Sequence, residues 1–315
     1  MPDACGQRDQ EVLLSLNPQA LKLLVPFPPG GSTDFTARIL ADRLAGVLDR
    51  PVTVETRTGD LGYNAVRALI EGPEDQVFLV GNINANSVAP VVQRGRVPID
   101  HWTVVQPVTR LAEFPSLVCT HRAFPADTLR DFLAHLKGTT GRLRYGTDFL
   151  GTYVDVDVIR LCIAADLDRS CLTTDGAMGI LADLEAERTD LAMLNVATAT
   201  ANAARLKPLA ISGPDRLRNF PDVPTLDEAG FAGIGTSNWQ GLLASRRAAP
   251  ETVAALYRAA VEAMRDPATM GRLAEIDARV ATSASPTQFE REIGAEAAQW
   301  EPYCDAIIHT PPLQR

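Results

Sequence analysis

Residues 24–34 read LVPFPPGGSTD, and this stretch decides the fold because an apolar run ends there in a stiff loop that contains glycine. The apolar run, Leu21–Val25, predicts a short buried strand, and the prolines after it stiffen the loop. Ser32 or Thr33 can cap a helix that starts next, and apolar side chains recur at helical spacing through residues 35–48. The stretch therefore predicts a strand, a tight loop and an amphipathic helix.

The same alternation of strands and helices continues along most of the chain. Strands at 51–55 and 76–80 enclose another helix, so this first series implies a mostly parallel sheet with helices on both faces. A second series begins with a strand at 116–120 and ends with a strand at 208–212. After a strand at 238–244, helices are predicted over 250–265, 267–276 and 286–308. The pattern indicates an α/β protein with two mostly parallel sheets, each flanked by helices.

Two α/β series followed by C-terminal helices predict two lobes, with the end of the chain returning to the first. We expect lobe I to comprise residues 20–118 and 222–315, and lobe II to comprise residues 119–221. Two chain crossings would form a hinge, and the cleft between the lobes would be the ligand site. Two independent tandem domains would give a similar pattern.

Length and composition restrict the possible partners. The chain has 315 residues, a formal net charge of -9 and 46% hydrophobic residues. The length favours two domains over one. An acidic balance argues against nucleic acid and anionic membrane surfaces as partners. It leaves an anionic ligand possible, because a pocket on an acidic protein can be locally positive.

The N-terminal residues lack a basic start followed by a long apolar region, so no signal peptide is predicted in the sequence as written. The protein would then be cytoplasmic, or an export signal is missing from this sequence.

The five cysteines show no C-x-x-C spacing, and zinc is therefore not expected. Cys162 and Cys171 could pair in an oxidising compartment, although buried free thiols are the favoured interpretation.

The glycine loop has the features of an anion site. Its two glycines let the backbone approach a ligand closely, and free amides at the start of the next helix lie at the positive end of the helix dipole. Such a site binds a carboxylate as well as a phosphate. A Walker lysine is absent, so a triphosphate is not expected. The alternative is an ordinary turn between a strand and a helix with a Ser or Thr cap.

Two other segments could contribute to a binding site. Residues 145–152, YGTDFLGT, also connect a strand to a helix, with Thr152 as a possible cap. One helix N-terminus from each lobe could hold a dicarboxylate. The run 81–87 is rich in amides and hydroxyls, which could line a polar pocket or form a turn. No nucleophile elbow and no H-E-x-x-H motif occurs in the sequence, so neither catalysis nor a metal is expected.

From residue 21 to about residue 300, the sequence resembles the Bug receptors, the solute-binding proteins of tripartite tricarboxylate transporters. The matching motifs are 24–34 with Ala37-Arg38, Arg50-Pro51-Val52 with Val54-Glu55, Tyr145-Gly146-Thr147 with Gly151-Thr152, 221–225 with Glu228-Ala229-Gly230, and Trp239 with Gly241-Leu242. The first and fourth of these motifs are the specific ones.

The resemblance implies a two-lobed periplasmic-binding-protein fold, also called a Venus flytrap, with no catalysis and no cofactor. It implies a periplasmic monomer that captures a small organic carboxylate or an amino-acid-like ligand for membrane transporter subunits. The ligand contacts expected from the loops and the resemblance together are Phe27, Gly30, Gly31, Ser32, Thr33, Asp34, Asn84, Thr147, Asp148, Phe149, Gly151, Thr152 and Asp175.

The sequence departs from the family pattern at Asp60, Phe149, Asp155 and Asp175, which predicts a bulkier and more acidic cleft. A carboxylate about 4 Å from an anion costs roughly 1 to 4 kcal/mol. The ligand could therefore be a monocarboxylate, an amino acid or amide with a cationic end, or an aromatic acid. Two other functions are considered: a cytoplasmic ligand sensor that retains the fold, and an α/β enzyme acting on a phosphorylated substrate.

Overall fold

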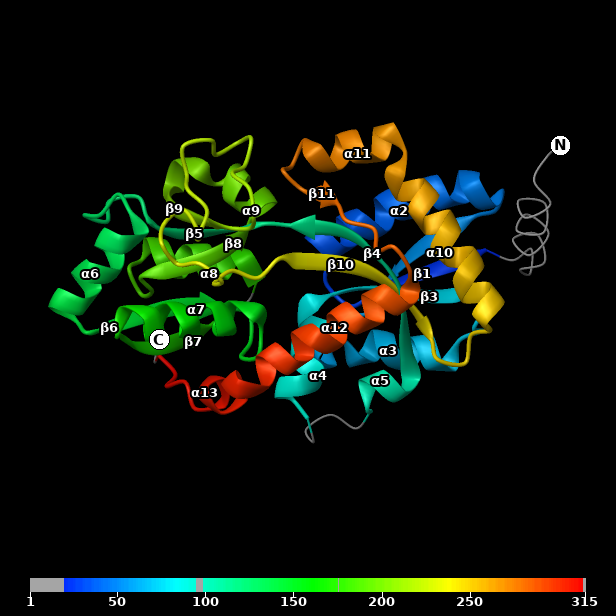
Figure 1. Ribbon diagram of the computed structural model, residues 1–315, viewed down its shortest axis with the longest axis horizontal. Coiled ribbons are helices and arrows are strands. Elements are labelled where there is room, and N and C mark those ends of the chain that lie inside the picture. The colour runs from blue at the N-terminus through cyan, green and yellow to red at the C-terminus, as the bar shows by residue number, and fades with distance from the viewer. Residues whose placement is uncertain (1–19, 95–98, 175, 314–315) are drawn as a thin grey trace. The chain divides into compact units, whose positions relative to one another are not determined.

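The computed structural model describes residues 20–94, 99–174 and 176–313, shown in Figure 1. The chain forms two compact units. Unit 1 contains residues up to Glu113 together with Trp239–Glu275 and Arg279–Ala298, and unit 2 contains Phe114–Asn238, Ile276–Ala278 and the residues from Gln299 onward.

Unit 1 is built on a six-stranded sheet in the order β11-β4-β10-β3-β1-β2. Its strands are β1 (Leu21–Val25), β2 (Val52–Thr56), β3 (Val77–Asn82), β4 (Val105–Phe114), β10 (Asn238–Ser245, whose first residue belongs to unit 2) and β11 (Arg279–Val280). β1 runs parallel to β2 and β3, whereas β10 is antiparallel to β3 and β11 is antiparallel to β4. The carboxyl ends of β1 and β3 and the beginning of β10 thus share one edge of this sheet.

The helical segments that begin in unit 1 are η1 (Asp60–Gly62), η2 (Asn84–Val88), α2 (Ser32–Leu48), α3 (Tyr63–Glu71), α4 (Ala89–Val92), α5 (His101–Val104), α10 (Pro250–Arg265), α11 (Pro267–Ala274) and α12 (Pro286–Trp300). α10 packs against α2. Apolar residues of α3, including Val66 and Leu69, pack on Leu24, Leu79 and Leu243 of the sheet. The burial of β1 between strands and helices explains its continuous apolar run.

Unit 2 is built on a five-stranded sheet in the order β7-β6-β8-β5-β9. Its strands are β5 (Ser116–His121), β6 (Arg142–Thr147), β7 (Asp168–Thr173), β8 (Leu191–Asn195) and β9 (Leu206–Ser212), and its helical segments are α6 (Leu129–Thr139), α7 (Tyr153–Ala165), α8 (Gly176–Glu185), α9 (Val196–Ala201), η3 (Ala203–Arg205), η4 (Glu301–Tyr303) and α13 (Cys304–Ile308). β6 is parallel to β7 and β8, and β5 is antiparallel to β8 and β9.

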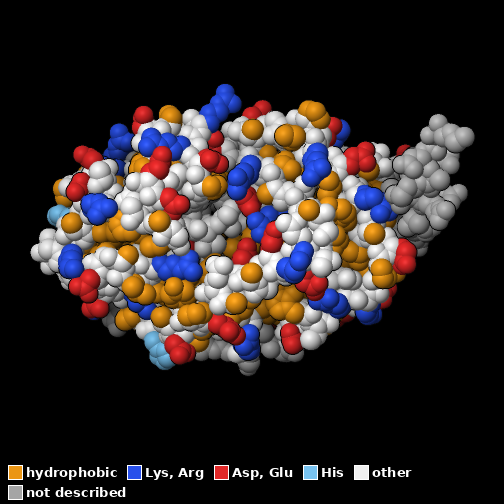
Figure 2. Space-filling view, viewed as in Figure 1, with side chains coloured by type: hydrophobic (Ala, Val, Ile, Leu, Met, Phe, Trp, Pro, Cys, Tyr) orange, Lys and Arg blue, Asp and Glu red, His pale blue; other side chains and the backbone are white. Residues whose placement is uncertain are grey.

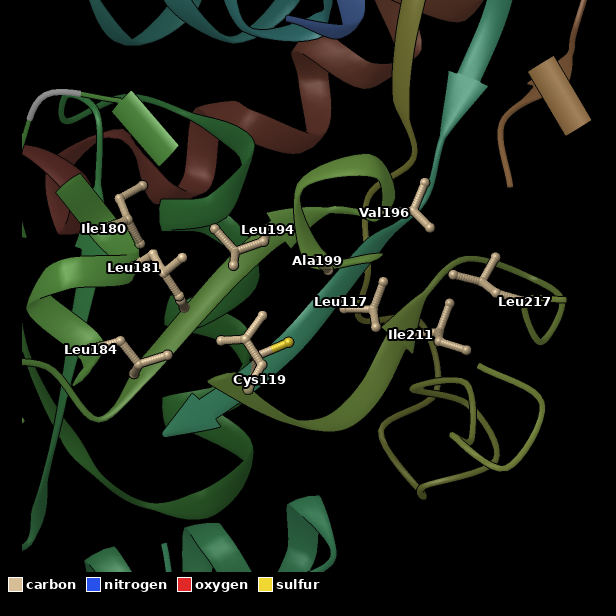
Figure 3. Close-up of a cluster of buried hydrophobic side chains, with 12 residues drawn as sticks. Leu117, Cys119, Ile180, Leu181, Leu184, Leu194, Val196, Ala199, Ile211 and Leu217 are labelled. Carbon is tan, nitrogen blue, oxygen red and sulfur yellow. The ribbon is translucent and has the colours of Figure 1, made fainter. Parts of the chain in front are cut away.

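The core beside α8 is a continuous apolar cluster. Figure 3 shows Leu181 and Leu184 of α8 directed toward Leu117, Cys119 and Leu194 of the sheet. Burial of large aliphatic side chains stabilises a fold by roughly 1.5–3 kcal/mol each. This cluster therefore fixes the face of the sheet that α8 covers.

Two secondary-structure predictions need correction, and one strand was missed. Both sheets are mixed rather than mostly parallel, because β5 and β10 run against their neighbours. β4 was not predicted from the sequence. The single helix expected over 286–308 is broken, since α12 ends at Trp300 and a 3₁₀ turn that contains Pro302 separates it from α13. Proline lacks the amide hydrogen that a continuing helix needs.

The unit boundaries differ from the expected lobes at four places. Unit 2 contains residues 114–118, 222–238, 276–278 and the segment from Gln299 onward, all of which the sequence placed in lobe I. The two longest of these segments are 222–238 and the one from Gln299 onward. Thr225 forms a β-bridge with Ile211, and Pro312 forms one with Cys171. These backbone contacts tie both segments to strands of the unit 2 sheet.

The surface visible in Figure 2 carries charges of both signs, and the two cysteines considered from the sequence do not form a disulfide. Acidic and basic side chains are interspersed over the face seen in Figure 2. Cys162 and Cys171 are free, buried thiols, and burial raises the pKa of each to about 12. Cys5 lies outside the described residues. Within the described ranges, no helix has both the length and the apolar character needed to cross a bilayer.

Asp157 of α7 holds the segment that leads into β10. Its carboxylate accepts hydrogen bonds from the amide of Thr236 at 2.8 Å and from the hydroxyl of Thr236 at 2.9 Å, and it is fully buried. Burial raises the pKa of Asp157 to about 6, although the bonds from Thr236 oppose the shift. Because an unfolded aspartate has a pKa of about 3.9, the folded state binds an additional proton between these two pH values.

We expect the free energy of unfolding of the wild type to decrease relative to that of Asp157→Asn by up to about 3 kcal/mol as the pH rises from about 4 to 7. The sign follows from the raised pKa, since the folded state loses stability when the buried carboxyl ionises. Asparagine offers one acceptor and one donor to Thr236 and does not titrate. Urea unfolding across this pH range measures the effect, and a difference that does not change with pH would contradict it.

Candidate functional site

The N-terminus of α2 is open. Gly31 is the residue before the helix, with extended angles of φ -80° and ψ 171°, and no side chain of the described residues caps the first turn. Gly31 is exposed and Ser32 is half-buried. The first amides of an α-helix have no partner within the helix, and they lie at the positive end of its dipole. α2 has 17 residues, so this terminus offers backbone donors to an anion.

Asp34 fixes the loop before α2. Gly30 has a φ of 88°, and its amide donates to Asp34 Oδ2 at 3.0 Å. Arg38 Nε donates to the same oxygen at 2.9 Å. Burial opposes ionisation of Asp34, but the bonds from Arg38 and Gly30 outweigh it and lower its pKa. Asp34 was expected to contact the ligand, and the structure shows its carboxylate engaged in holding the glycine loop.

Thr33 lies beneath the first turn and contacts the sheet. Its side chain is 2% exposed. The hydroxyl donates to Gln240 Oε1 of β10 at 2.7 Å and accepts from Asn82 Nδ2 of β3 at 3.3 Å. Gln240 Nε2 also lies 3.4 Å from Ser32 Oγ. Sequence reasoning missed Gln240 and Asn82, although both lie inside segments that it had singled out, 239–242 and 81–87.

The polar run after β3 forms a structural turn. Residues Asn84–Val88 adopt a π-helical turn, a conformation that is rare and often found near functional sites. Asn86 Oδ1 accepts from the amide of Asn82 at 3.0 Å, and Asn86 Nδ2 contacts His101 Nε2 at 3.2 Å. Burial lowers the pKa of His101 to about 3. Asn84, the expected ligand contact in this run, is half-buried.

The N-terminus of α7 in unit 2 is closed by its own acid. Asp155 Oδ2 accepts from the amides of Gly151 and Thr152 at 2.9 and 2.8 Å, and from the hydroxyl of Thr152 at 3.0 Å. Asp155 Oδ1 accepts from the hydroxyl of Tyr145 at 2.6 Å. Burial raises the pKa of Asp155, and the four donors oppose that shift. Two amides expected to bind ligand are therefore engaged within the loop.

The remaining expected contacts of unit 2 lie in the same loop. Thr147 is buried, and its hydroxyl lies 3.2 Å from both the hydroxyl of Thr152 and the carbonyl oxygen of Phe149. Asp148 is exposed and Phe149 is half-buried. Asp175 lies outside the described residues. Among the residues that the structure describes, no group of three or more His, Cys, Asp or Glu side chains could hold a metal ion.

Comparison with known proteins identifies the family. The model of the tripartite tricarboxylate transporter family receptor, TctC, matches residues 36–308. BugT of Bordetella pertussis is 26% identical over 287 residues, which cover 89% of this chain and 86% of BugT.

Solved structures share the fold. A periplasmic transporter with 27% identity superposes with a TM-score of 0.81, covering 93% of this chain and 98% of that one. Rpa4515 of R. palustris, solved with adipate, has 25% identity and a TM-score of 0.82, covering 94% and 100% of the two chains. The predicted periplasmic-binding-protein fold and the resemblance to the Bug receptors are confirmed. This chain belongs to the family of tripartite tricarboxylate transporter receptors.

Proposed function

We propose that this receptor captures a small organic carboxylate at the N-terminus of α2. The observation that carries the proposal is the open first turn, with Gly31 exposed and Ser32 half-buried at the positive end of a 17-residue helix. Oriented backbone amides and a helix dipole suit a carboxylate. The adipate in Rpa4515 supports this ligand class.

In this proposal the residues of the first loop have distinct roles. The amides at Gly31, Ser32 and Thr33 and the hydroxyl of Ser32 donate to the carboxylate, while half-buried Phe27 contacts its apolar part. Asp34 holds the loop. Its charge is offset by Arg38 at 2.9 Å, so repulsion of a bound anion is reduced.

In unit 2, residues 147–152 remain proposed ligand contacts. Asp155 engages the amides of Gly151 and Thr152. Exposed Asp148 and half-buried Phe149 can still offer their side chains. We further propose that the receptor is a monomer acting outside the cytoplasm, that it delivers its ligand to membrane transporter subunits, and that it performs no reaction on it.

A panel of matched probes tests the ligand class. Adipate, hexanoate, 6-aminohexanoate and benzoate should be compared with adipamide, a neutral analogue, by thermal unfolding and titration calorimetry. A ligand that binds only the folded state stabilises it by about 2.7 kcal/mol at 100 times its Kd. We expect at least one carboxylate to raise the Tm and adipamide to have no effect. Binding of adipamide alone, or of none of the probes, would overturn the proposal.

A further inference from the structure

A chain of hydrogen bonds runs beneath the first turn of α2, and its direction can be assigned from one end. The amide of Ala85 points to the side chain of Asn82 at 3.1 Å. A backbone N–H can only donate, so the atom facing it is the Asn82 oxygen. The Asn82 nitrogen therefore faces Thr33 Oγ1, 3.3 Å away, and donates to it.

The direction then passes through Thr33 to Gln240. Accepting from Asn82 leaves the single proton of Thr33 Oγ1 available, and in the structure that proton is donated to Gln240 Oε1, 2.7 Å away. The Gln240 nitrogen then faces Ser32 Oγ at 3.4 Å and donates to it. Because the hydroxyl of Ser32 accepts this bond, its own proton remains available for donation to another group.

We infer that Gln240 is a positioning residue that makes the hydroxyl of Ser32 a hydrogen-bond donor toward the bound carboxylate. This inference rests on the proposed function of the α2 terminus. Thr33, Asn82 and Gln240 are uncharged and at most 7% exposed. Solvent therefore does not reverse the donor–acceptor direction of the hydrogen bonds between them. Because none of the three is charged, the chain adds no negative charge that would repel a bound carboxylate. Gln240 lies on β10 two residues after the chain leaves unit 2 at Asn238.

Two variants test the inference, with adipate and hexanoate as probes and with calorimetry between about pH 6.5 and 8.5. Ser32→Ala removes the terminal donor and should weaken binding about 10- to 100-fold, because a hydrogen bond to a charged group contributes roughly 1.5–3 kcal/mol. Gln240→Glu keeps the shape of the side chain. Once ionised, the introduced carboxylate cannot donate, so Ser32 would turn its proton toward it and present lone pairs to the ligand.

Binding of either probe by Gln240→Glu should therefore require protonation of the new carboxyl. We expect binding at pH 8.5 to be at least about 10-fold weaker than that of the wild type and to recover as the pH falls. Calorimetry in buffers of different ionisation enthalpy should show uptake of up to one proton per probe bound. The wild type and Ser32→Ala should show none.

Gln106→Glu is a matched control. Gln106 Nε2 donates to the carbonyl oxygens of Ser245 and Ala248, at the other end of β10. That variant also loses a donor and should lower the Tm, but its binding should not become linked to protons. Unchanged affinity in Ser32→Ala would overturn the inference and leave the proposed function standing, and so would pH-independent binding without proton uptake in Gln240→Glu. The inference is also overturned if the wild type binds neither adipate nor hexanoate. The proposed function is overturned only if the whole panel of carboxylates fails to bind.

Discussion

Replacing Gly31 by valine is expected to weaken carboxylate binding at least about 100-fold, because two or more charge-assisted hydrogen bonds, each contributing roughly 1.5–3 kcal/mol, would be lost. The backbone of Gly31 is extended, with φ -80°, and a β-branched residue adopts that conformation without strain. A Cβ there would meet only the carbonyl oxygen of Pro28, at 3.8 Å. The side chain would occupy the space beside the open amides and leave the protein's own packing intact.

Calorimetry with the tightest probe of the panel and urea unfolding should be run on the same Gly31→Val preparation. The free energy of unfolding should stay within about 1 kcal/mol of that of the wild type. Gly31→Ala should give an intermediate affinity. Gly46→Ala adds a methyl group to the same helix where nothing lies within 4 Å, and should bind as the wild type does. Wild-type affinity in folded Gly31→Val would exclude the loop from the site.

The beginning of α2 could be predicted from sequence because it follows local rules. Prolines and glycines determine the loop, and the helical spacing of apolar residues determines which face of the helix is buried. The roles of Thr33 and Asp34 could not be predicted in the same way. Thr33 contacts Gln240, which is 207 positions away in sequence. The engagement of Asp34 with Gly30 depends on the positive φ of that glycine.

β4 was missed for a related reason. It contains Pro107, Arg110 and Glu113, which a strand pattern read locally does not favour. In the fold, Glu113 is only 5% exposed, and it pairs with Arg110 and with Arg279 of β11. Burial alone would raise the pKa of Glu113, but the two guanidinium groups lower it. Partners from distant segments therefore allow charged side chains in a buried strand.

The acid at Asp155 shows the same dependence on three-dimensional context. From sequence it suggested a more acidic ligand cleft. In the structure its side chain is fully buried and accepts four hydrogen bonds, two of them from amides of its own loop. Gly151 has a φ of 100°, which allows its amide to reach a carboxylate four residues later. Residue type alone could not distinguish an acid that faces a ligand from one that closes a helix terminus.

Gly81→Ala is expected to lower the free energy of unfolding by about 3 kcal/mol or more, through overpacking and a broken buried hydrogen bond. Gly81 lies on β3 opposite Gly241 of β10. A Cβ on Gly81 would stand 1.8 Å from Asn86 Oδ1 and 2.7 Å from Asn86 Cγ. Asn86 would have to move, and the amide of Asn82 would lose its 3.0 Å partner. Asn82 also donates to Thr33 in the first turn of α2, so the loss falls on a residue that supports this turn.

A double-mutant cycle identifies Asn86 as the cause. Asn86→Ala alone should cost roughly 1–3 kcal/mol, because it leaves the buried amide of Asn82 without its acceptor. Since the same substitution removes the atoms that clash, Gly81→Ala with Asn86→Ala should cost at least about 1 kcal/mol less than the sum of the single changes. Gly294→Ala, where a Cβ meets nothing within 4 Å, serves as the control. Additive costs in urea unfolding would mean that the close approach of β3 to Asn86 does not require glycine at this position.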